Sequence, residues 1–250
     1  TETPEEGLNI RHALRSTTPS KAERDEKTGL PFAVTVDRIT LDGGRLALQL
    51  ASIAGVRSVQ DISLLLRGRI DRQGVILELQ QLNALAQPAD VRIESASGGF
   101  FMHSGTMRFE ELSLHTASTH ITLDGALPVQ GDLADLSLAL RPLNVSEVGR
   151  LLADETLHGD VRLYLSGVGP SEAIEVSGRL EAGSGRMQLQ GFVNAVARPP
   201  RYRAELGATA LDIAAVIARP GLRSDLNVGV SLEGKGLVPD EFQGVLRLDI

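Results

Sequence analysis

The sequence predicts an all-β protein: an elongated antiparallel β-groove with a taco-like shape, or a β-solenoid, built from repeats of about 67 residues with a few short helices. Three observations predict this class. Apolar and polar residues alternate with a period of two, turn-forming residues recur about every ten residues, and one pattern of strands and helix occurs twice.

The amino-acid composition argues against several classes of function. The 250-residue chain is 42% hydrophobic but only 3% aromatic, so its apolar residues are mainly Leu, Val, Ile and Ala. A net charge of −7 argues against nucleic acid as a partner. The absence of Cys excludes disulfides, thiolate catalysis and Cys-based zinc sites. No apolar run reaches the length of about 18 residues that a membrane-spanning helix needs.

The chain divides into two parts by composition. Residues 1–29 are rich in charge, Ser, Thr and Pro, which predicts a flexible charged linker. Residues 30–250 carry the regular alternation, which we interpret as a repetitive β-groove region and a piece of a longer protein. The final segment, Phe242–Ile250, has apolar residues on one face. We therefore expect it to pair with another copy or to aggregate in isolation.

The strands are predicted from alternation in chain order. Val34 and Val36, then Leu46 and Leu48, open a series that continues along the whole chain. Gly and Asp clusters separate the predicted strands, and each predicts a turn: Asp42-Gly43-Gly44, Asp71–Gly74, Gly98-Gly99 and Asp124-Gly125.

An internal repeat organises the second half of the chain. Four segments of residues 121–186 recur in the same order in residues 187–250, at offsets of about 66 to 68 residues. Each unit is expected to hold about four strands and one short helix. The helices are predicted at 144–153 and 212–218, with Asn144 and Asp212 as N-caps and Glu147 at the capping-box position.

Candidate catalytic groups are few. His115 and His120 flank the turn-like segment 116–119 and are expected to meet across a hairpin, with Asp124 as the nearest third metal ligand; His103 completes the best polar cluster. Solvent-facing strand positions explain these residues better than a metal site does. No nucleotide loop, nucleophile motif or acid–base pair is present, so we expect no enzyme activity, no cofactor and no metal.

The apolar set of the strands is the candidate functional surface. It has two interpretations that the alternation does not separate: an open groove for apolar ligands, or a closed β-sandwich or β-helix whose apolar faces pack together in a binding module. The predicted lining residues are Val161, Leu163, Leu165, Ile174, Val176, Leu180, Met187, Leu189, Val228, Val230, Leu232, Leu246 and Leu248.

These patterns resemble a known family. Leu30–Gly44 resembles the openings of AsmA-like proteins, and Leu143–Gly178 and Tyr202–Gly244 resemble repeats of the TamB branch. The resemblance implies a β-groove in the periplasm of a diderm bacterium, with the full-length protein anchored in the inner membrane. It implies phospholipid transport between the membranes and outer-membrane biogenesis. The implied partners are phospholipid acyl chains, further repeats of the same chain, and a β-barrel such as TamA. Assistance to outer-membrane protein assembly or secretion is the alternative function.

Overall fold

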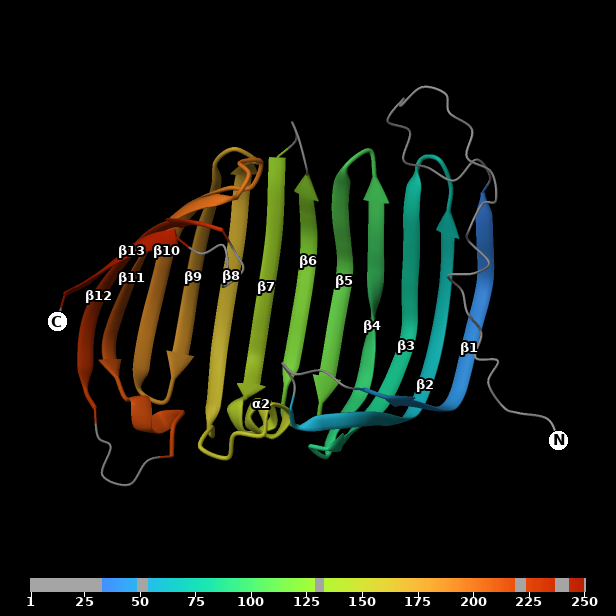
Figure 1. Ribbon diagram of the computed structural model, residues 1–250, viewed down its shortest axis with the longest axis horizontal. Helices are drawn as coiled ribbons and strands as arrows, with labels where there is room; N and C mark the ends of the chain where they lie inside the picture. Colours follow the sequence, from blue (N-terminus) through green and yellow to red (C-terminus); the bar gives the residue numbers. More distant parts are fainter. Residues whose placement is uncertain (1–32, 49–53, 129–132, 219–223, 237–242, 250) are drawn as a thin grey trace.

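The protein forms a single antiparallel sheet in this computed structural model, which describes residues 33–48, 54–128, 133–218, 224–236 and 243–249. Thirteen strands follow one another in chain order, each paired with the next (Figure 1). The prediction of an elongated all-β groove is confirmed. The solenoid alternative is wrong, because every one of the described strand pairs is antiparallel and joins consecutive strands.

The strands are long, which lets the sheet be broad as well as extended. Their bounds are β1 Val34–Ala47, β2 Val56–Ile70, β3 Gly74–Pro88, β4 Val91–His103, β5 Thr106–Thr116, β6 His120–Pro128, β7 Leu133–Asn144, β8 Asp160–Pro170, β9 Ile174–Ala182, β10 Gly185–Asn194, β11 Arg201–Leu211, β12 Leu226–Lys235 and β13 Gln243–Asp249. Residues 1–32, and with them the predicted linker, lie outside the described residues, as do Phe242 and Ile250.

Three of the four predicted turns are wrong. Asp42-Gly43-Gly44 lies inside β1, Gly98-Gly99 inside β4, and Asp124-Gly125 inside β6. The first two coincide with shifts in strand register, so the extra residue forms a β-bulge and the strand continues. Only the Asp71–Gly74 turn is confirmed; there the carboxylate of Asp71 accepts hydrogen bonds from the backbone N–H groups of Gln73 and Gly74.

The repeat in the sequence corresponds to two sets of four strands. β6 to β9 hold the helix α2 (Val145–Leu152) between the second and third strands, and β10 to β13 hold the 3₁₀ turn η1 (Ile213–Ala215) at the same place. Asn144 caps α2 by accepting the N–H of Glu147, and Asp212 caps η1 by accepting the N–H of Ala214. Both predicted N-caps are confirmed, but the second helix is shorter than predicted.

Glu147 stabilises α2 in a different way from the predicted capping box. Its carboxylate is buried and accepts hydrogen bonds from the hydroxyls of Thr116 and Thr119, both at 2.6 Å. The Thr119 hydroxyl in turn accepts the backbone N–H of Asn144 at 3.0 Å. A threonine of the β5–β6 turn therefore takes the place of the glutamate at the N-cap, which ties α2 to the sheet.

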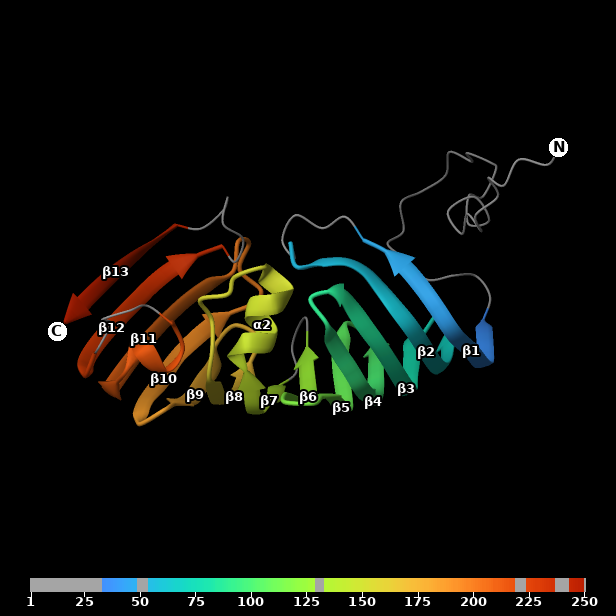
Figure 2. The ribbon, with the colours of Figure 1, turned by 90° about the horizontal axis from the view of Figure 1, so that it is seen from below.

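The sheet is curved, and α2 lies on its concave side (Figure 2). At the same rim of the sheet, the start of β2 runs across toward α2, and the N–H of Gly55 donates to the carbonyl of Leu151. A small core forms there from Val56, Ala89 and Val91, packed against Leu151 of the helix. Because α2 lies on the concave side, the side chain of Val91 points to that side as well. Val91 is paired with Ala86 and Ala86 with Val59 in one apolar row, so the apolar face of the sheet is the concave one.

We predict that Glu147→Ala lowers the free energy of unfolding by about 2–3 kcal/mol, because the hydroxyls of the buried Thr119 and the part-buried Thr116 lose a charged acceptor. Urea unfolding followed by circular dichroism measures the change. Glu155→Ala is the matched control, since Glu155 is an exposed residue in the loop that follows the same helix, and it is expected to stay within about 0.5 kcal/mol of the parent. Equal stability of the two variants would contradict the role given to Glu147.

Candidate functional site

The concave face carries continuous rows of apolar side chains that run from strand to strand. Strand pairing places one such row across twelve strands, with an apolar residue at each position: Leu41, Leu64, Leu82, Ala96, Leu114, Ile121, Leu140, Leu163, Leu180, Met187, Ala208 and Val228. A neighbouring row includes Leu123, Leu138, Leu165, Leu189, Leu206 and Val230. At about 4.8 Å between neighbouring strands, the eleven spacings of the first row give it a length of about 53 Å.

Most of the predicted lining residues belong to these rows. Register places Leu163, Leu180, Met187 and Val228 in the first row, and Leu165, Leu189, Val230 and Leu248 in the second. Val176, Leu232 and Leu246 share a third row, while Val161 pairs with Ala182 and Ile174 with Val193 nearer the rims. The predicted set therefore comes from one face of the sheet.

The opposite, convex face carries charged and hydroxyl pairs between strands, together with exposed apolar side chains such as Phe192. Arg203 and Glu233 form an ion pair at 3.0 Å across β11 and β12, and the hydroxyls of Ser166 and Ser177 lie 2.8 Å apart across β8 and β9. Arg67 and Glu78 make a further ion pair across β2 and β3. Because side chains alternate between faces, each strand separates an apolar surface from a charged one.

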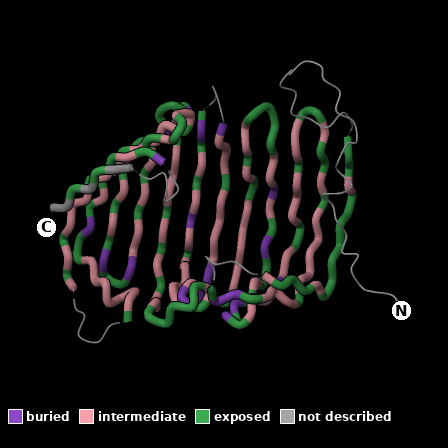
Figure 3. The backbone as a smooth tube through the Cα atoms, in the orientation of Figure 1, coloured by how far each residue is buried: buried purple, intermediate pink, exposed green. Residues whose placement is uncertain are grey.

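No second layer covers the apolar face within the described residues. Of their apolar side chains, ten are buried, and seven of those ten are alanines. The leucines of the rows are only partly buried, and intermediate burial extends along most of the strands (Figure 3). A packed sandwich would bury these leucines, since a core residue contacts atoms on every side. The closed-sandwich interpretation is therefore wrong.

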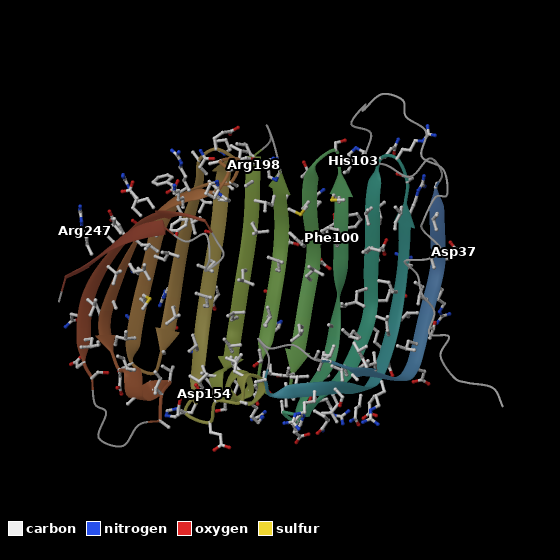
Figure 4. The ribbon with its side chains drawn as sticks, in the orientation of Figure 1. Asp37, Phe100, His103, Asp154, Arg198 and Arg247 are labelled. Carbon is white, nitrogen blue, oxygen red and sulfur yellow. The ribbon has the colours of Figure 1, made fainter. Side chains whose placement is uncertain are left out.

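One rim of the sheet is closed by the segments that follow the helices. The N–H of His158 donates to the carbonyl of Val216, and the N–H of Ala218 donates to that of Thr156. Leu157 and Ile217 form an isolated antiparallel bridge between the two repeats. Asp154 marks this rim in Figure 4, and Arg198 and His103 mark the opposite one. The concave face is thus bordered on one side by helices and their linked loops.

The predicted lining set missed the contribution of the first seven strands to this face. Leu64, Leu82 and Leu114 continue the row that starts in the second half, and Phe100 packs against Phe109 with 5.6 Å between ring centroids. The signal is present in the chain: where a bulge occurs, apolar residues are spaced by three instead of two, as in Leu79 to Leu82.

His115 and His120 form a pair on the convex face, but the other candidate ligands do not join them in a metal site. His115 and His120 are paired across the hairpin, and their rings stack at 3.9 Å, as the spacing predicts. Asp124 instead accepts the N–H of Glu111, and His103 lies at the opposite rim of the sheet, where β4 ends (Figure 4). Among the described residues, no group of three His, Cys, Asp or Glu side chains is placed to hold a metal ion.

Burial lowers the pKa of His120, and the positive charges of His115 and Arg141 lower it further. Arg141 itself lies over the ring of Tyr164, 4.5 Å from its centroid. Since the unfolded chain holds a proton on His120 at higher pH than the folded protein does, stability is expected to rise with pH between the lowered value and about 6.5.

We predict that the unfolding free energy falls as the pH drops below about 6.5, and that His120→Gln reduces this dependence. Urea unfolding from pH 5 to 8 measures it. Arg141→Gln is expected to raise the pKa of His120 in an NMR titration, because one repelling charge is removed. A His120 that titrates at or above its ordinary value in the parent would contradict the prediction.

The comparisons with known proteins give no match: no family model, no curated protein and no solved structure corresponds to this chain. No described helix has the length and hydrophobicity that crossing a membrane requires.

Proposed function

We propose that this protein is a non-enzymatic segment of a bridge that carries phospholipids along its apolar concave face. The observation that carries the proposal is the uncovered apolar row across twelve strands. An acyl chain fills about half of a 30 Å bilayer core, so each chain would cover about three strand spacings of 4.8 Å. Each methylene group kept from water contributes about 0.8 kcal/mol.

The uniformity of the apolar face favours the movement of phospholipid along it over the binding of phospholipid at one fixed site. The first row consists of aliphatic side chains and one Met, so successive strands offer an acyl chain nearly the same environment. A ligand-specific pocket combines an enclosed shape with a few placed polar groups. A surface without such groups favours sliding, and sliding needs no chemistry.

The proposal includes the setting that the AsmA-like resemblance implies. The protein would act in the periplasm of a diderm bacterium, as a part of an inner-membrane-anchored protein, beside an outer-membrane β-barrel partner such as TamA. Further repeats of the same chain would lengthen the apolar face on which the phospholipids move.

The test is direct capture of lipid. A photoreactive amino acid at Leu165, on the apolar face, is expected to crosslink phospholipid when the protein is expressed in a diderm host. The same probe at Ser166 is the control, because this neighbouring residue of β8 points to the convex face, where its hydroxyl contacts Ser177. Native mass spectrometry of the purified protein provides a second readout. Equal labelling at both positions, or no bound phospholipid, would overturn the proposal.

A charge on the apolar face should affect lipid binding more than folding. We expect Leu165→Asp to keep the strand content measured by circular dichroism and to reduce co-purified phospholipid several-fold, since Leu165 is only partly buried. Ile174→Asp is the comparison, because Ile174 is 6% exposed and a carboxylate there should unfold the protein. If Leu165→Asp also unfolds, the face is covered in solution.

A further inference from the structure

The first strand of the sheet has a long edge with apolar side chains. β1 has 14 residues and, among the described residues, pairs only with β2. Several of its apolar side chains are exposed: Val34 is 38% exposed, Leu41 42% and Leu46 52%. An edge of this kind presents unpaired backbone groups, and such a strand is a template for another strand.

β1 is symmetric about Thr40 in its apolar pattern. Ile39 and Leu41 are one residue away from Thr40, Val36 and Gly44 four residues away, and Val34 and Leu46 six residues away. Each of these six residues has a partner in β2. The pattern reads the same in both chain directions.

The two bulges in which β1 holds the extra residue obey the same symmetry; at the third register shift, between Gly44 and Leu46, the extra residue is in β2. One extra residue lies between Val36 and Ile39, at Asp37-Arg38, and another lies between Leu41 and Gly44, at Asp42-Gly43. These two positions are equidistant from Thr40. The charges are complementary as well, because Arg38 and Asp42 are each two residues from Thr40 and carry opposite charge.

We infer that β1 is a self-association edge, at which two copies of this chain pair antiparallel about a two-fold axis through Thr40. In this register Ile39 faces Leu41 of the other copy on the apolar side, and Arg38 faces Asp42 on the convex side. Each pair occurs twice. The two Thr40 residues face each other on the axis, a cross-strand pair that is favourable in antiparallel sheets.

The bulges make this pairing selective. A bulge on an edge strand normally blocks a further strand, because the extra residue has no counterpart there. The two-fold axis supplies the counterpart, since it places Asp37-Arg38 of one copy opposite Asp42-Gly43 of the other. A strand without two bulges at this spacing would lose register, so a second copy fits the edge better than an unrelated strand does.

Pairing at β1 would join the two apolar faces into one surface. A two-fold axis perpendicular to the sheet keeps both concave faces on the same side, and the sheet then has twice the thirteen strands. β13 is less suited, with seven residues. Because the strand number is odd, β1 and β13 run in the same direction, so joining them with the faces aligned would give a parallel pair. This inference does not depend on lipid as the ligand.

A charge exchange tests the register with the full 250-residue chain. A single pair of edge strands buries little area, so we expect dissociation constants on the order of micromolar. Arg38→Asp and Asp42→Arg should each weaken self-association at least about tenfold, since each places like charges opposite one another twice. A mixture of the two variants should associate like the parent, because both pairs are then opposite in charge. Analytical ultracentrifugation measures all three samples.

A cysteine at the axis gives an independent readout in a chain that has no native Cys. In an antiparallel pair the facing Cα atoms are about 4.5–5.5 Å apart, within the range of a disulfide. Thr40→Cys should therefore form a covalent dimer on mild oxidation. Thr35→Cys is the control on the same strand, since its two copies would lie about 33 Å apart.

Three outcomes would overturn the inference. The first is a parent that stays monomeric at about 100 μM, well above the expected dissociation constant. The second is self-association that neither charge variant weakens, which would place the contact elsewhere, for example at β13. The third is equal crosslinking at Thr35→Cys and Thr40→Cys.

Discussion

The whole structure depends on strand register. Twelve successive pairings must keep apolar residues on one face, and a slip of one residue in any of them would turn the rest of the sheet over. The bulges accommodate this constraint. Between Leu79 and Leu82, and between Leu140 and Leu143, the chain inserts one extra residue, and the apolar side chains return to the same face on the far side of each bulge. The residues within these bulges are Gln80-Gln81 and Arg141-Pro142, which carry no large aliphatic side chain.

Much of the fold could be predicted from the sequence for this reason. Period-two alternation identified the strands and the apolar set, and the caps Asn144 and Asp212 located both helical turns. The errors came from Gly and Asp residues, which are common to turns and bulges. Asp42-Gly43 is flanked by Leu41 and Gly44 at a spacing of three, which marks a bulge, whereas a turn would have reversed the chain. The hydrogen bond between Thr119 and Glu147 could not be predicted from the sequence, because it joins a loop and a helix 28 residues apart.

The curved sheet has little core of its own, so its stability must come from other sources. Backbone hydrogen bonds between neighbouring strands stabilise the sheet along its whole length. Buried contacts at the two rims add further stability. One rim has the cluster of Val56, Ala89 and Val91 beneath α2, and the other has the buried Ser171, whose hydroxyl donates to the carbonyl of Pro128. Placing the buried contacts at the rims leaves the middle of the concave face uncovered. A protein that packed this face would be more stable and would have no apolar surface to offer.

The alternation of side chains between the two faces also explains where the polar groups lie. Alternation requires every second residue to be on the convex face, and there ion pairs such as Arg203–Glu233 hold neighbouring strands with side chains that water can reach. Exposed pairs of this kind add little stability each, but they keep the convex face soluble while the other face stays apolar. At β1 this division reaches the edge of the sheet, with Ile39 and Leu41 on one side and Arg38 and Asp42 on the other. An edge with both faces already sorted in this way can extend the sheet by simple pairing, without any rearrangement of either copy.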